Sequence, residues 1–496
     1  MPIYIYNSLS RRKEEFIPLN PPQVNIYTCG VTVYDESHIG HARSLYIFDV
    51  IRRYLKYRGF NVKFVRNITD IDDKIINRAK EIKMDWKGLV GKYIALYKKD
   101  LEILGIQEGD CEPRATENIA DMIKHIEELI NKGFAYITDS GVYFNVRKFK
   151  DYGKLSGQGI DQMLSGARIE PDEAKQDPLD FALWKISKPD DPSWPSPWGQ
   201  GRPGWHIECS VMSQKFLKID TLDIHAGGRD LIFPHHENEI AQAEALTGKP
   251  FAKYWIHHGL LTINGQKMAK SLGNFVTIKT ALEGLPDAHA ADILKDFFLR
   301  THYSSPIDYS SEAIREAKEE IFRFSKAAEQ PPNIVTAKDN SKDNSENEHT
   351  EYVNGLGDSF KSAMDNDFNM PQARAALCEL VRYCNRLEDR WKVGHRYLFS
   401  VIQYTKNMLR ELASILGLSL NSVNEHDPKW GDISLTNVLS NVLIEAQEIQ
   451  KKIDERTKMR REKRYSDADK IKKELLGKGI LLKDKEDGTT EWEWKK

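Results

Sequence analysis

The sequence predicts an α/β fold in which an insertion splits a nucleotide-binding sheet, followed by a helical bundle and a small C-terminal module. Three observations lead to this prediction. A strand, loop and helix pattern opens the chain, the same pattern resumes near residue 222, and a helical pattern with a basic end follows a polar tract. The 496 residues exceed what one hydrophobic core can hold and predict about three or four domains.

Composition narrows the class of protein before any motif is considered. The formal net charge of −2 excludes a global polycation, so nucleic-acid binding would have to come from a local patch. The five cysteines are sparse and odd in number, and no basic segment followed by an apolar run opens the chain, which favours a reducing compartment without disulfides. No run approaches the roughly 18 apolar residues of a membrane helix. We therefore expect a cytoplasmic protein without membrane spans.

The first elements are typical of a nucleotide-binding sheet. The apolar run from Val24 to Tyr27 predicts a buried strand. Apolar residues then recur at helical spacing from His41 to Arg58, and Gly59 ends that helix. The pattern in Asn61 to Arg66 predicts the next strand, which gives one half of a Rossmann-like sheet.

An insertion is expected between the two halves of the sheet. Thr116 is predicted to cap an amphipathic helix that Gly133 ends. Loop chemistry follows, because five prolines stand among tryptophans between residues 188 and 204. We place this insertion at 120–201.

The second half of the chain completes the sheet and adds two further modules. A strand is predicted at Leu222 to Ala226, and a helix from Pro234 to Leu246, with Gly248 beyond its end. The polar tract 330–351 has almost no large apolar residues and predicts a linker or a mobile loop. A helical bundle follows it, and eleven Lys or Arg against five acids fall between residues 451 and 473.

The motif His38-Ile39-Gly40-His41 lies where the first predicted strand gives way to a helix. Gly40 permits close approach of a planar base, and a helix N-terminus favours phosphate. The two imidazoles can donate hydrogen bonds to phosphate oxygens as charge develops on them. The motif is therefore a candidate ATP site, and the alternative is a surface pair of histidines.

A second motif, Lys267-Met268-Ala269-Lys270-Ser271, follows an Asn264-Gly265 turn. Two lysines three residues apart on a loop can clamp a pyrophosphate leaving group, although each can also belong to a solvated face. The two motifs lie roughly 230 residues apart and flank a split sheet. Together they resemble the HIGH and KMSKS signatures of class I aminoacyl-tRNA synthetases. Ala269 stands where that class usually has serine, which removes a hydroxyl and keeps both lysines. A Walker-type loop and a glycine-rich dinucleotide fingerprint are absent from the sequence.

Four dispersed side chains are candidate metal ligands: Cys29, Cys209, His235 and Glu239. On a helix His235 and Glu239 face one way, so with two cysteines they can make a four-ligand zinc shell. His236 with Ile240 forms the competing face, and periodicity does not choose between the histidines. Alternatively, the cysteines are small core residues and the histidine cluster is a capped, solvated helix start.

Several segments, read in order, resemble the bacterial type of cysteinyl-tRNA synthetase. They are Tyr27–Asp35, His38–His41, Asn67–Lys74, Gly204–Ser210, Asp223–His225, Phe233–Glu239 and Lys267–Ser271. The resemblance covers about residues 1 to 310 and continues at Met364–Asn369, which is similar to the family's helical-bundle motif, and from Ala468 to Thr489, which is similar to its anticodon-domain end. Only the tract 330–351 is unlike a typical member.

The resemblance implies roles for individual residues. The zinc ligands would be Cys29, Cys209, His235 and Glu239. The amino acid would be bound by Thr69, Trp205 and His225. ATP would be bound by Gly40, Asp230 and Lys270, with His38, His41, Lys267 and Lys270 as the catalytic groups. Without the resemblance, Trp205 is a core residue, His225 a satisfied histidine at a strand end, and Asp230 a helix cap.

The implied function is a cysteine–tRNA ligase. Cysteine and ATP, with magnesium, would form cysteinyl-adenylate, and the 3′-terminal adenosine of tRNA(Cys) would then accept the cysteine, by class analogy at its 2′-hydroxyl. One zinc ion per chain would select the substrate as a thiolate, which the harder and far less acidic hydroxyl of serine does not imitate. We expect a monomer. Two alternatives remain: a cysteine ligase of mycothiol type acting on an amino sugar, and a catalytically dead RNA-binding adaptor.

The sequence patterns and the resemblance together predict that the chain divides into six regions. They are a Rossmann-like class I synthetase catalytic first half at 1–119, a connective insertion at 120–201, a catalytic second half at 202–248, a stem-contact region with the lysine loop at 249–315, a helical bundle with the polar linker at 316–428, and an anticodon-binding module at 429–496.

Overall fold

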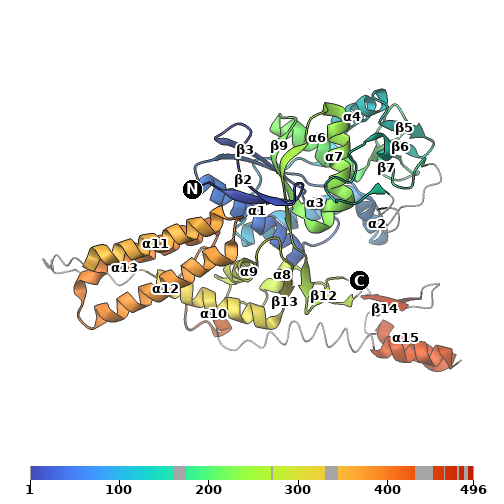
Figure 1. The fold of residues 1–496 in the computed structure, drawn as a ribbon. Coiled ribbons are helices and arrows are strands. Elements are labelled where there is room, and N and C mark those ends of the chain that lie inside the picture. The colour runs from blue at the N-terminus through green and yellow to red at the C-terminus, as the bar shows by residue number, and fades with distance from the viewer. Residues whose placement is uncertain are drawn as a thin grey trace.

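A four-stranded parallel sheet forms the centre of the computed structural model (Figure 1). The structure describes residues 2–160, 163, 175–269, 272–329, 345–430, 451–462, 464–477, 480–484 and 490–494. The sheet has the order β10-β9-β3-β4, with β3 at Gln23–Thr28, β4 at Asn61–Arg66, β9 at Leu222–Gly228 and β10 at Ala252–His258. All pairings are parallel, and β3 meets β9 where the two halves of the sheet join. In such sheets ligands bind beyond the carboxyl ends of the strands at this junction.

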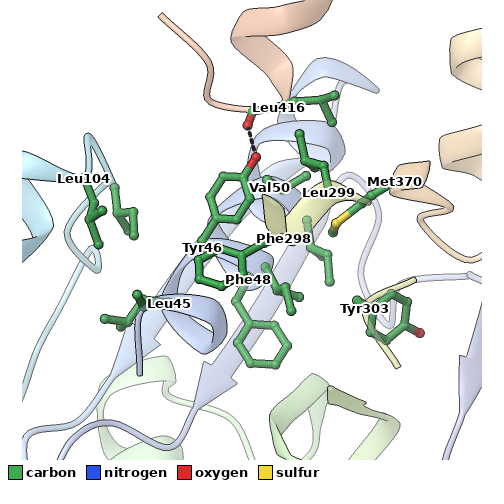
Figure 2. Close-up of a cluster of buried hydrophobic side chains, with 14 of the residues drawn as sticks. Leu45, Tyr46, Phe48, Val50, Leu104, Phe298, Leu299, Tyr303, Met370 and Leu416 are labelled. Carbon is green, nitrogen blue, oxygen red and sulfur yellow. Dashed lines mark hydrogen bonds between the residues drawn. The ribbon is translucent and has the colours of Figure 1, made fainter. Parts of the chain in front are cut away.

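Helix α1, Ile39–Tyr57, connects β3 to β4. It begins two residues before the predicted start because His38 is its N-cap: the His38 side chain accepts from the backbone N–H groups of Gly40 and His41. The His41 side chain accepts in turn from the backbone N–H of His38, which makes a reciprocal cap. Helix α1 packs against α9 and against α13, which is Phe399–Ile415, and the Tyr46 hydroxyl donates to the Leu416 carbonyl at 2.6 Å (Figure 2).

The predicted insertion is a separate small layer beside the parallel sheet. Between β4 and β9 the chain forms α2 Asp73–Glu81, α3 Trp86–Ile103, η1 Ala115–Glu117, α4 Ile119–Asn131, β5 Ala135–Thr138, β6 Gly141–Phe144, η2 Val146–Lys148, β7 Phe181–Ile186, β8 Gly201–Pro203 and α6 Trp205–Leu217. Strands β5 to β8 make an antiparallel sheet in sequence order. A second hydrophobic core joins this sheet to α4, α6 and α7, so the insertion is held by packing.

The elements after β9 complete the catalytic half and lead into the bundle. They are η3 Arg229–Leu231, the π-helical turn η4 Ile232–His236, α7 Glu237–Thr247, β11 Leu261–Ile263, β12 Gln266–Lys267, α8 Ile278–Leu282, α9 Ala290–Leu299, β13 Ile307–Tyr309 and α10 Ser311–Ala328. The bundle contains α11 Ser345–Asp365, α12 Met370–Lys392, η6 Arg396–Leu398 and α13 Phe399–Ile415, and η7 Pro428–Trp430 follows it. In Figure 1 the long helices α11, α12 and α13 extend away from the parallel sheet.

The two ends of the chain carry small units. At the N-terminus, β1 Tyr4–Asn7 and β2 Arg12–Glu15 form a hairpin. At the C-terminus, a helical segment at 451–462 and α15 Tyr465–Gly477 precede the hairpin β14 Ile480–Asp484 and β15 Thr490–Trp494. Among the described residues, no helix combines the length and the apolar content needed to cross a membrane.

Three local predictions were wrong, each for a physical reason. Thr116 does not cap α4, because its hydroxyl and N–H both donate to the Asp70 carboxylate at 2.6 and 2.9 Å. The predicted helix from Pro234 becomes α-helical only at Glu237, because residues 234–236 form the end of the π-helical turn η4, which is broken just before Pro234 by the extended φ and ψ of −137° and 132° at Phe233. Residues 345–351 of the polar tract are helical and open α11, whereas 330–344 lie outside the described residues.

Candidate active site and metal centre

The first signature presents two imidazoles at the N-terminus of α1. The rings of His38 and His41 stack with centroids 3.7 Å apart. Nδ1 of His38 accepts from the N–H groups of Gly40 at 3.1 Å and His41 at 3.3 Å, so its proton is on Nε2. Nδ1 of His41 accepts from the His38 N–H at 3.4 Å. Burial, with the charges of His38 and Lys74, holds the pKa of His41 well below its ordinary value. The capping bonds therefore fix both Nε2–H groups as donors.

The lysine loop packs directly against this signature. A Cβ placed on Gly40 would lie 2.9 Å from the His38 ring, so glycine makes room for that ring, and Cε of Met268 in the lysine loop would be 3.7 Å from the same Cβ. Lys267 ends β12 and is exposed. Asn274, which is buried, accepts from the Ala269 N–H at 2.8 Å and donates to the Lys267 carbonyl at 3.1 Å. Lys270, the second predicted lysine, lies outside the described residues.

The segment after the lysine loop is hydrogen-bonded to the residues around His38. The Ile39 N–H donates to the Val276 carbonyl at 3.1 Å, and the Ile278 N–H donates to the Ser37 carbonyl at 3.0 Å. His38 and Thr277 form the bridge between these bonds. The two signatures, far apart in sequence, thus belong to one site.

The four predicted metal ligands come together at the carboxyl end of the sheet. Cys29 follows β3, Cys209 lies in α6, His235 in η4 and Glu239 in α7, and one ligand atom from each lies within 4.8 Å of all the others. Nε2 of His235 is 2.9 Å from Oε1 of Glu239 and 3.5 Å from Sγ of Cys209. Sγ of Cys29 is 3.4 Å from the same Oε1. Two thiols, an imidazole and a carboxylate are a donor set that zinc accepts.

The structure also brings together a second possible set. Cys29, His225, His236 and Glu239 satisfy the same 4.8 Å criterion, so the competing histidine face is not remote from the site. Nε2 of His236 lies 3.2 Å from Sγ of Cys29, and its Nδ1 lies 2.8 Å from Nε2 of His257. The two sets share Cys29 and Glu239.

The pKa values of Cys209, His235 and Glu239 show how strongly these buried groups interact with one another. Burial raises the pKa of Cys209, but a hydrogen bond from Cys29 and the neighbouring His235 lower it to about 6. Burial disfavours charge on His235, yet Glu239 and Cys209 raise its pKa to about 10. Burial also opposes charge on Glu239, although His225 and His235 hold its pKa well below the usual range. The cluster thus gathers thiol and carboxylate groups around His235, and a metal ion bound there would replace the proton on its Nε2.

The predicted amino-acid pocket borders this cluster. The Trp205 ring is 37% exposed and stacks on His235 with centroids 3.9 Å apart, so it is not a core residue. The Thr69 hydroxyl donates to Oε2 of Glu208 at 2.7 Å and accepts from the Asn67 amide at 3.3 Å. His225 is fully buried, with Nε2 2.6 Å from Oε2 of Glu239, and its Nδ1 has no partner among the described residues.

The predicted ATP residue Asp230 lies in η3, at the carboxyl end of β9. It is exposed and does not cap the following helix, since η4 begins after Leu231 without a side-chain cap. A Cβ on Gly228 would lie 2.4 Å from Oδ1 of Asp230, so glycine makes room for this carboxylate.

Four further residues in the site have no role in the sequence-based prediction. His206 holds Nδ1 of His235 at 2.9 Å, and His257 links His236 to the Ser8 hydroxyl. Asn67 joins Thr69 to Cys209, and Asn274 holds the lysine loop. Two of them, Asn67 and His206, stand inside motifs that the sequence already singles out, but only the folded chain shows which atoms they hold.

Family models and curated relatives both match this chain to cysteine-specific tRNA synthetases. The family model described as the catalytic domain of class I (C) tRNA synthetases matches residues 15–319, and the DALR domain matches 359–421. Cysteine–tRNA ligase of Thermodesulfovibrio yellowstonii is 48% identical and covers 98% of each chain. That of Aquifex aeolicus is 45% identical over 100% of this chain and 99% of its own.

Solved structures share the fold at low identity. Methionyl-tRNA synthetase of Mycobacterium tuberculosis in complex with methionyl-adenylate aligns with a TM-score of 0.59 at 16% identity, over 84% of this chain and 93% of its own. The leucyl enzyme of Agrobacterium radiobacter, in a ternary complex with tRNA, gives 0.59 at 12% identity, over 82% and 87%.

Proposed function

The chain belongs to the family of cysteine–tRNA ligases, which are class I aminoacyl-tRNA synthetases, and from this premise we propose which of its residues carry out the reaction. The function is to activate L-cysteine with ATP and to transfer it to the 3′-terminal adenosine of tRNA(Cys). The observation that carries the assignment of residues is the convergence of both signatures and four metal-binding side chains at one edge of the sheet.

The proposed metal is zinc, held by Cys29, Cys209, His235 and Glu239. This set is favoured over the one with His236 because it offers two thiol donors where the other offers one. Oε2 of Glu239 is held by His225, which leaves Oε1 toward the thiols, and Nδ1 of His235 is held by His206. When bound, zinc would supply a soft Lewis acid that favours a thiolate substrate over the hydroxyl of serine.

Cysteine would bind between the metal cluster and the first signature. Trp205 covers His235 and offers an apolar face at the opening of the cluster, while Thr69 supplies a hydroxyl fixed by Glu208. His225 would act indirectly, because its bond to Oε2 of Glu239 orients that proposed metal ligand. A site built around a bond that the competitor lacks can reject it by about 10⁴ or more, so selection against serine needs no second site.

In the first step a carboxylate oxygen of cysteine attacks the α-phosphorus of ATP. The bond from that phosphorus to the bridging oxygen of the β-phosphate breaks, and pyrophosphate leaves, with magnesium accompanying the nucleotide. The Nε2–H groups of His38 and His41 donate to phosphate oxygens, and Lys267 and Lys270 neutralise the leaving group. In this proposal Gly40 lets the base approach the helix, and Asp230 accepts hydrogen bonds from the ribose hydroxyls.

In the second step a hydroxyl of the terminal ribose of tRNA, the 2′-hydroxyl by class analogy, attacks the carbonyl carbon of the adenylate. The bond from that carbon to the phosphate oxygen breaks, AMP leaves, and cysteine stays on the tRNA. The DALR match at 359–421 lies in the bundle, which favours a tRNA acceptor over an amino sugar. The full-length ligase relatives likewise do not favour the dead adaptor. The six domain ranges given above, and a monomeric state, remain part of the proposal.

One preparation tests the assignment. We expect ATP–pyrophosphate exchange that depends on cysteine and not on serine, charging of tRNA(Cys), and about one zinc ion per chain by elemental analysis. Exchange with cysteine in a preparation that holds no zinc would contradict the metal assignment. Exchange without tRNA charging would contradict the transfer step.

A further inference from the structure

The turn at 365–369 joins α11 to α12 and carries a motif that the reaction does not use. The sequence here is Asp365-Asn366-Asp367-Phe368-Asn369, inside the DALR match. Its two carboxylates are buried, with exposed fractions of 5% for Asp365 and 7% for Asp367. A buried carboxylate is retained only where hydrogen bonds satisfy it, so the partners of these groups show what the turn holds.

Asp367 holds the turn to the N-terminal hairpin and to the segment after α9. Its Oδ1 accepts from the Tyr6 N–H at 2.8 Å and from the Tyr303 hydroxyl at 2.7 Å. The backbone adds to these bonds, because the Asp367 N–H donates to the Tyr4 carbonyl at 2.7 Å and its carbonyl lies 3.0 Å from Nε2 of His302.

Asp365 holds the same turn to the far end of α1. Its Oδ1 accepts from the Tyr54 hydroxyl at 2.6 Å and pairs with Arg58. The Tyr54 hydroxyl is also 3.1 Å from the Lys361 carbonyl on α11. The ring of Phe368 lies edge-on to that of Tyr54, with centroids 6.2 Å apart. One helix, α1, therefore begins at the first signature and ends at the bundle.

The backbone of the turn is held in an unfavourable conformation. Asp367 and Phe368 have φ of 63° and 46°, in the left-handed region that side chains with a Cβ rarely adopt. Two such residues in a row persist only where the surroundings determine the conformation, and here the bonds of Asp365 and Asp367 do so.

We propose that the turn 365–369 is one joint that holds the helical bundle at its angle to the catalytic half, alongside contacts such as that of Tyr46 with Leu416, and that Asp365 and Asp367 are positioning residues for tRNA charging. This proposal rests on the proposed function, because it needs a tRNA that contacts both parts. Tyr54 lies 13 residues beyond His41, about 20 Å along the helix at ~1.5 Å per residue, so the joint is remote from the adenylation site. Adenylate formation does not depend on it.

Transfer to tRNA depends on the joint, because the nucleic acid must meet the bundle side and the active site at the same time. A linkage with a defined angle raises the effective concentration of the acceptor end at the adenylate, and a loose linkage lowers it. Misplacement of a reacting group by about 1 Å can cost on the order of 10²-fold in rate.

Conservative variants can test the joint because they remove its hydrogen bonds and keep most of its packing. Tyr303→Phe and Tyr54→Phe each remove one hydrogen bond to a joint carboxylate and keep the ring. Asp367→Ala removes both side-chain hydrogen bonds of that residue and its contact with His302. Asp358→Ala is the matched control, since Asp358 lies on α11 with its side chain 71% exposed. Each variant is assayed for cysteine-dependent pyrophosphate exchange, for charging of full-length tRNA(Cys), and for charging of an RNA duplex that carries only the acceptor arm.

We expect exchange within about twofold of the parent in every variant. The kcat/KM for full-length tRNA should fall about tenfold in Asp367→Ala and several-fold in each tyrosine variant, with no change in Asp358→Ala. Charging of the acceptor duplex should be the same in variants and parent, because this substrate does not span the joint.

Equal losses in exchange and in charging would overturn the proposal, and so would unchanged tRNA charging in all three joint variants. If Asp367→Ala does not fold, the two tyrosine variants decide between these outcomes. A parent that shows no cysteine-dependent exchange would contradict the proposed function instead, so the two failures are distinguishable.

Discussion

At the scale of single residues, the side chains of the site are oriented by a second buried partner. Glu239 is bonded through Oε2 to His225, and His235 through Nδ1 to His206, so each presents one defined atom to the metal cluster. Such outer partners fix the tautomer and direction of a ligand. Substitutions in this cluster can therefore be predicted atom by atom.

The first prediction concerns the proposed thiolate ligands. Cys209→Ser replaces a soft donor with a hydroxyl at a buried position, so zinc content should fall well below one ion per chain and cysteine-dependent exchange should fall by at least about tenfold. Elemental analysis and exchange on one preparation check both. Cys378→Ser is the control, because Cys378 lies on α12 beside Arg374 and Glu320 and should change neither value. Full zinc occupancy in Cys209→Ser would exclude Cys209 as a ligand.

The second prediction concerns pH and His125, a buried histidine on α4. Burial lowers its pKa to about 4, partly opposed by a hydrogen bond to the Gln242 backbone. The folded chain keeps it neutral while the unfolded chain binds a proton below pH 6.5, so its contribution to stability is greatest above pH 6.5 and falls as the pH drops toward 4. The loss is about 1.4 kcal/mol per pH unit in that window.

His125→Asn keeps a side-chain N–H donor and removes the titration. The variant is expected to be less stable than the parent at pH 7.5, yet its melting temperature should fall less between pH 7.5 and 5.0. Melting curves at several pH values check this difference. A parallel decline in parent and variant would show that His125 is not a source of the pH dependence.

At the scale of elements, two buried polar residues hold the signature segments. Asn274 bonds both ends of the described part of the lysine loop, through Ala269 and Lys267. Asn274→Ala should leave the loop without these bonds and reduce kcat for pyrophosphate exchange about tenfold, with the KM for cysteine unchanged. Leu272→Ala, at a half-exposed position in the same loop, is the control and should stay close to the parent. A changed KM for cysteine would place Asn274 in substrate binding.

Arg43, two residues after the first signature, holds α1 to two other segments. Its guanidinium donates to the carbonyls of Gly259 at 2.7 Å and Leu260 at 2.9 Å, and to those of Tyr303 at 3.3 Å and Ser305 at 2.6 Å. Burial lowers its pKa to about 10, so it stays charged at neutral pH. The single ammonium of Arg43→Lys does not reach four carbonyls in a fixed fork.

We expect Arg43→Lys to lower kcat/KM for ATP in the exchange reaction about tenfold, since residues 259–260 lead into β11 and the lysine loop. Zinc content should not change, because the metal cluster lies on other segments. Exchange kinetics and elemental analysis separate the two effects, and full activity would show that α1 needs no such attachment.

Sequence patterns predicted strands and helices well where apolar periodicity and turn residues pointed to the same boundaries. Residues Asn61–Arg66 form β4 as predicted, because alternating apolar residues and a preceding glycine leave little choice. The start of α1 was missed by two residues, since a histidine is not a usual N-cap and His38 acts as one only with His41. The error at Thr116 has a tertiary cause, because its partner Asp70 comes from a segment 46 residues away.

The residues of the candidate site were harder to predict from sequence spacing than the strands and helices were. Spacing alone left His235 and His236 open, and the structure places both against Cys29 or Glu239. The resemblance to the family, not periodicity, favoured His235. The roles of His206 and Asn274 come from contacts between segments, which no periodicity reports.

At the scale of the whole molecule, the C-terminal module carries a positive charge that the rest of the chain lacks. Part of this charge is neutralised internally, since Arg456 and Arg460 pair with Asp484. Lys458, Arg461, Lys472 and Lys473 are exposed. Such residues contact phosphates and make affinity fall with salt. We expect Trp492 and Trp494 of β15 to stack on unpaired bases of the anticodon. Their side chains lie outside the described part of the chain.

Removal of this module should separate the two steps. Truncation is best made after Trp430, because its ring packs at 5.0 Å from both His289 and Phe322 and Lys429 pairs with Asp287. The shortened chain should keep cysteine-dependent exchange, while kcat/KM for tRNA falls by about 10² or more and its salt dependence flattens. Charging at several salt concentrations checks this. A truncated chain that charges tRNA as well as the parent would exclude the module as the anticodon-binding element.

The spread of the proposed metal ligands along the chain also determines when the metal site can form during synthesis on the ribosome. Cys29 and Glu239 are 210 residues apart, and the insertion lies between them. At a translation rate of about 5–20 residues per second, Glu239 is synthesised roughly 10–40 s after Cys29. Until then no nascent chain contains the full donor set, so the proposed zinc ion can be captured only after β3, β4 and β9 have all been made.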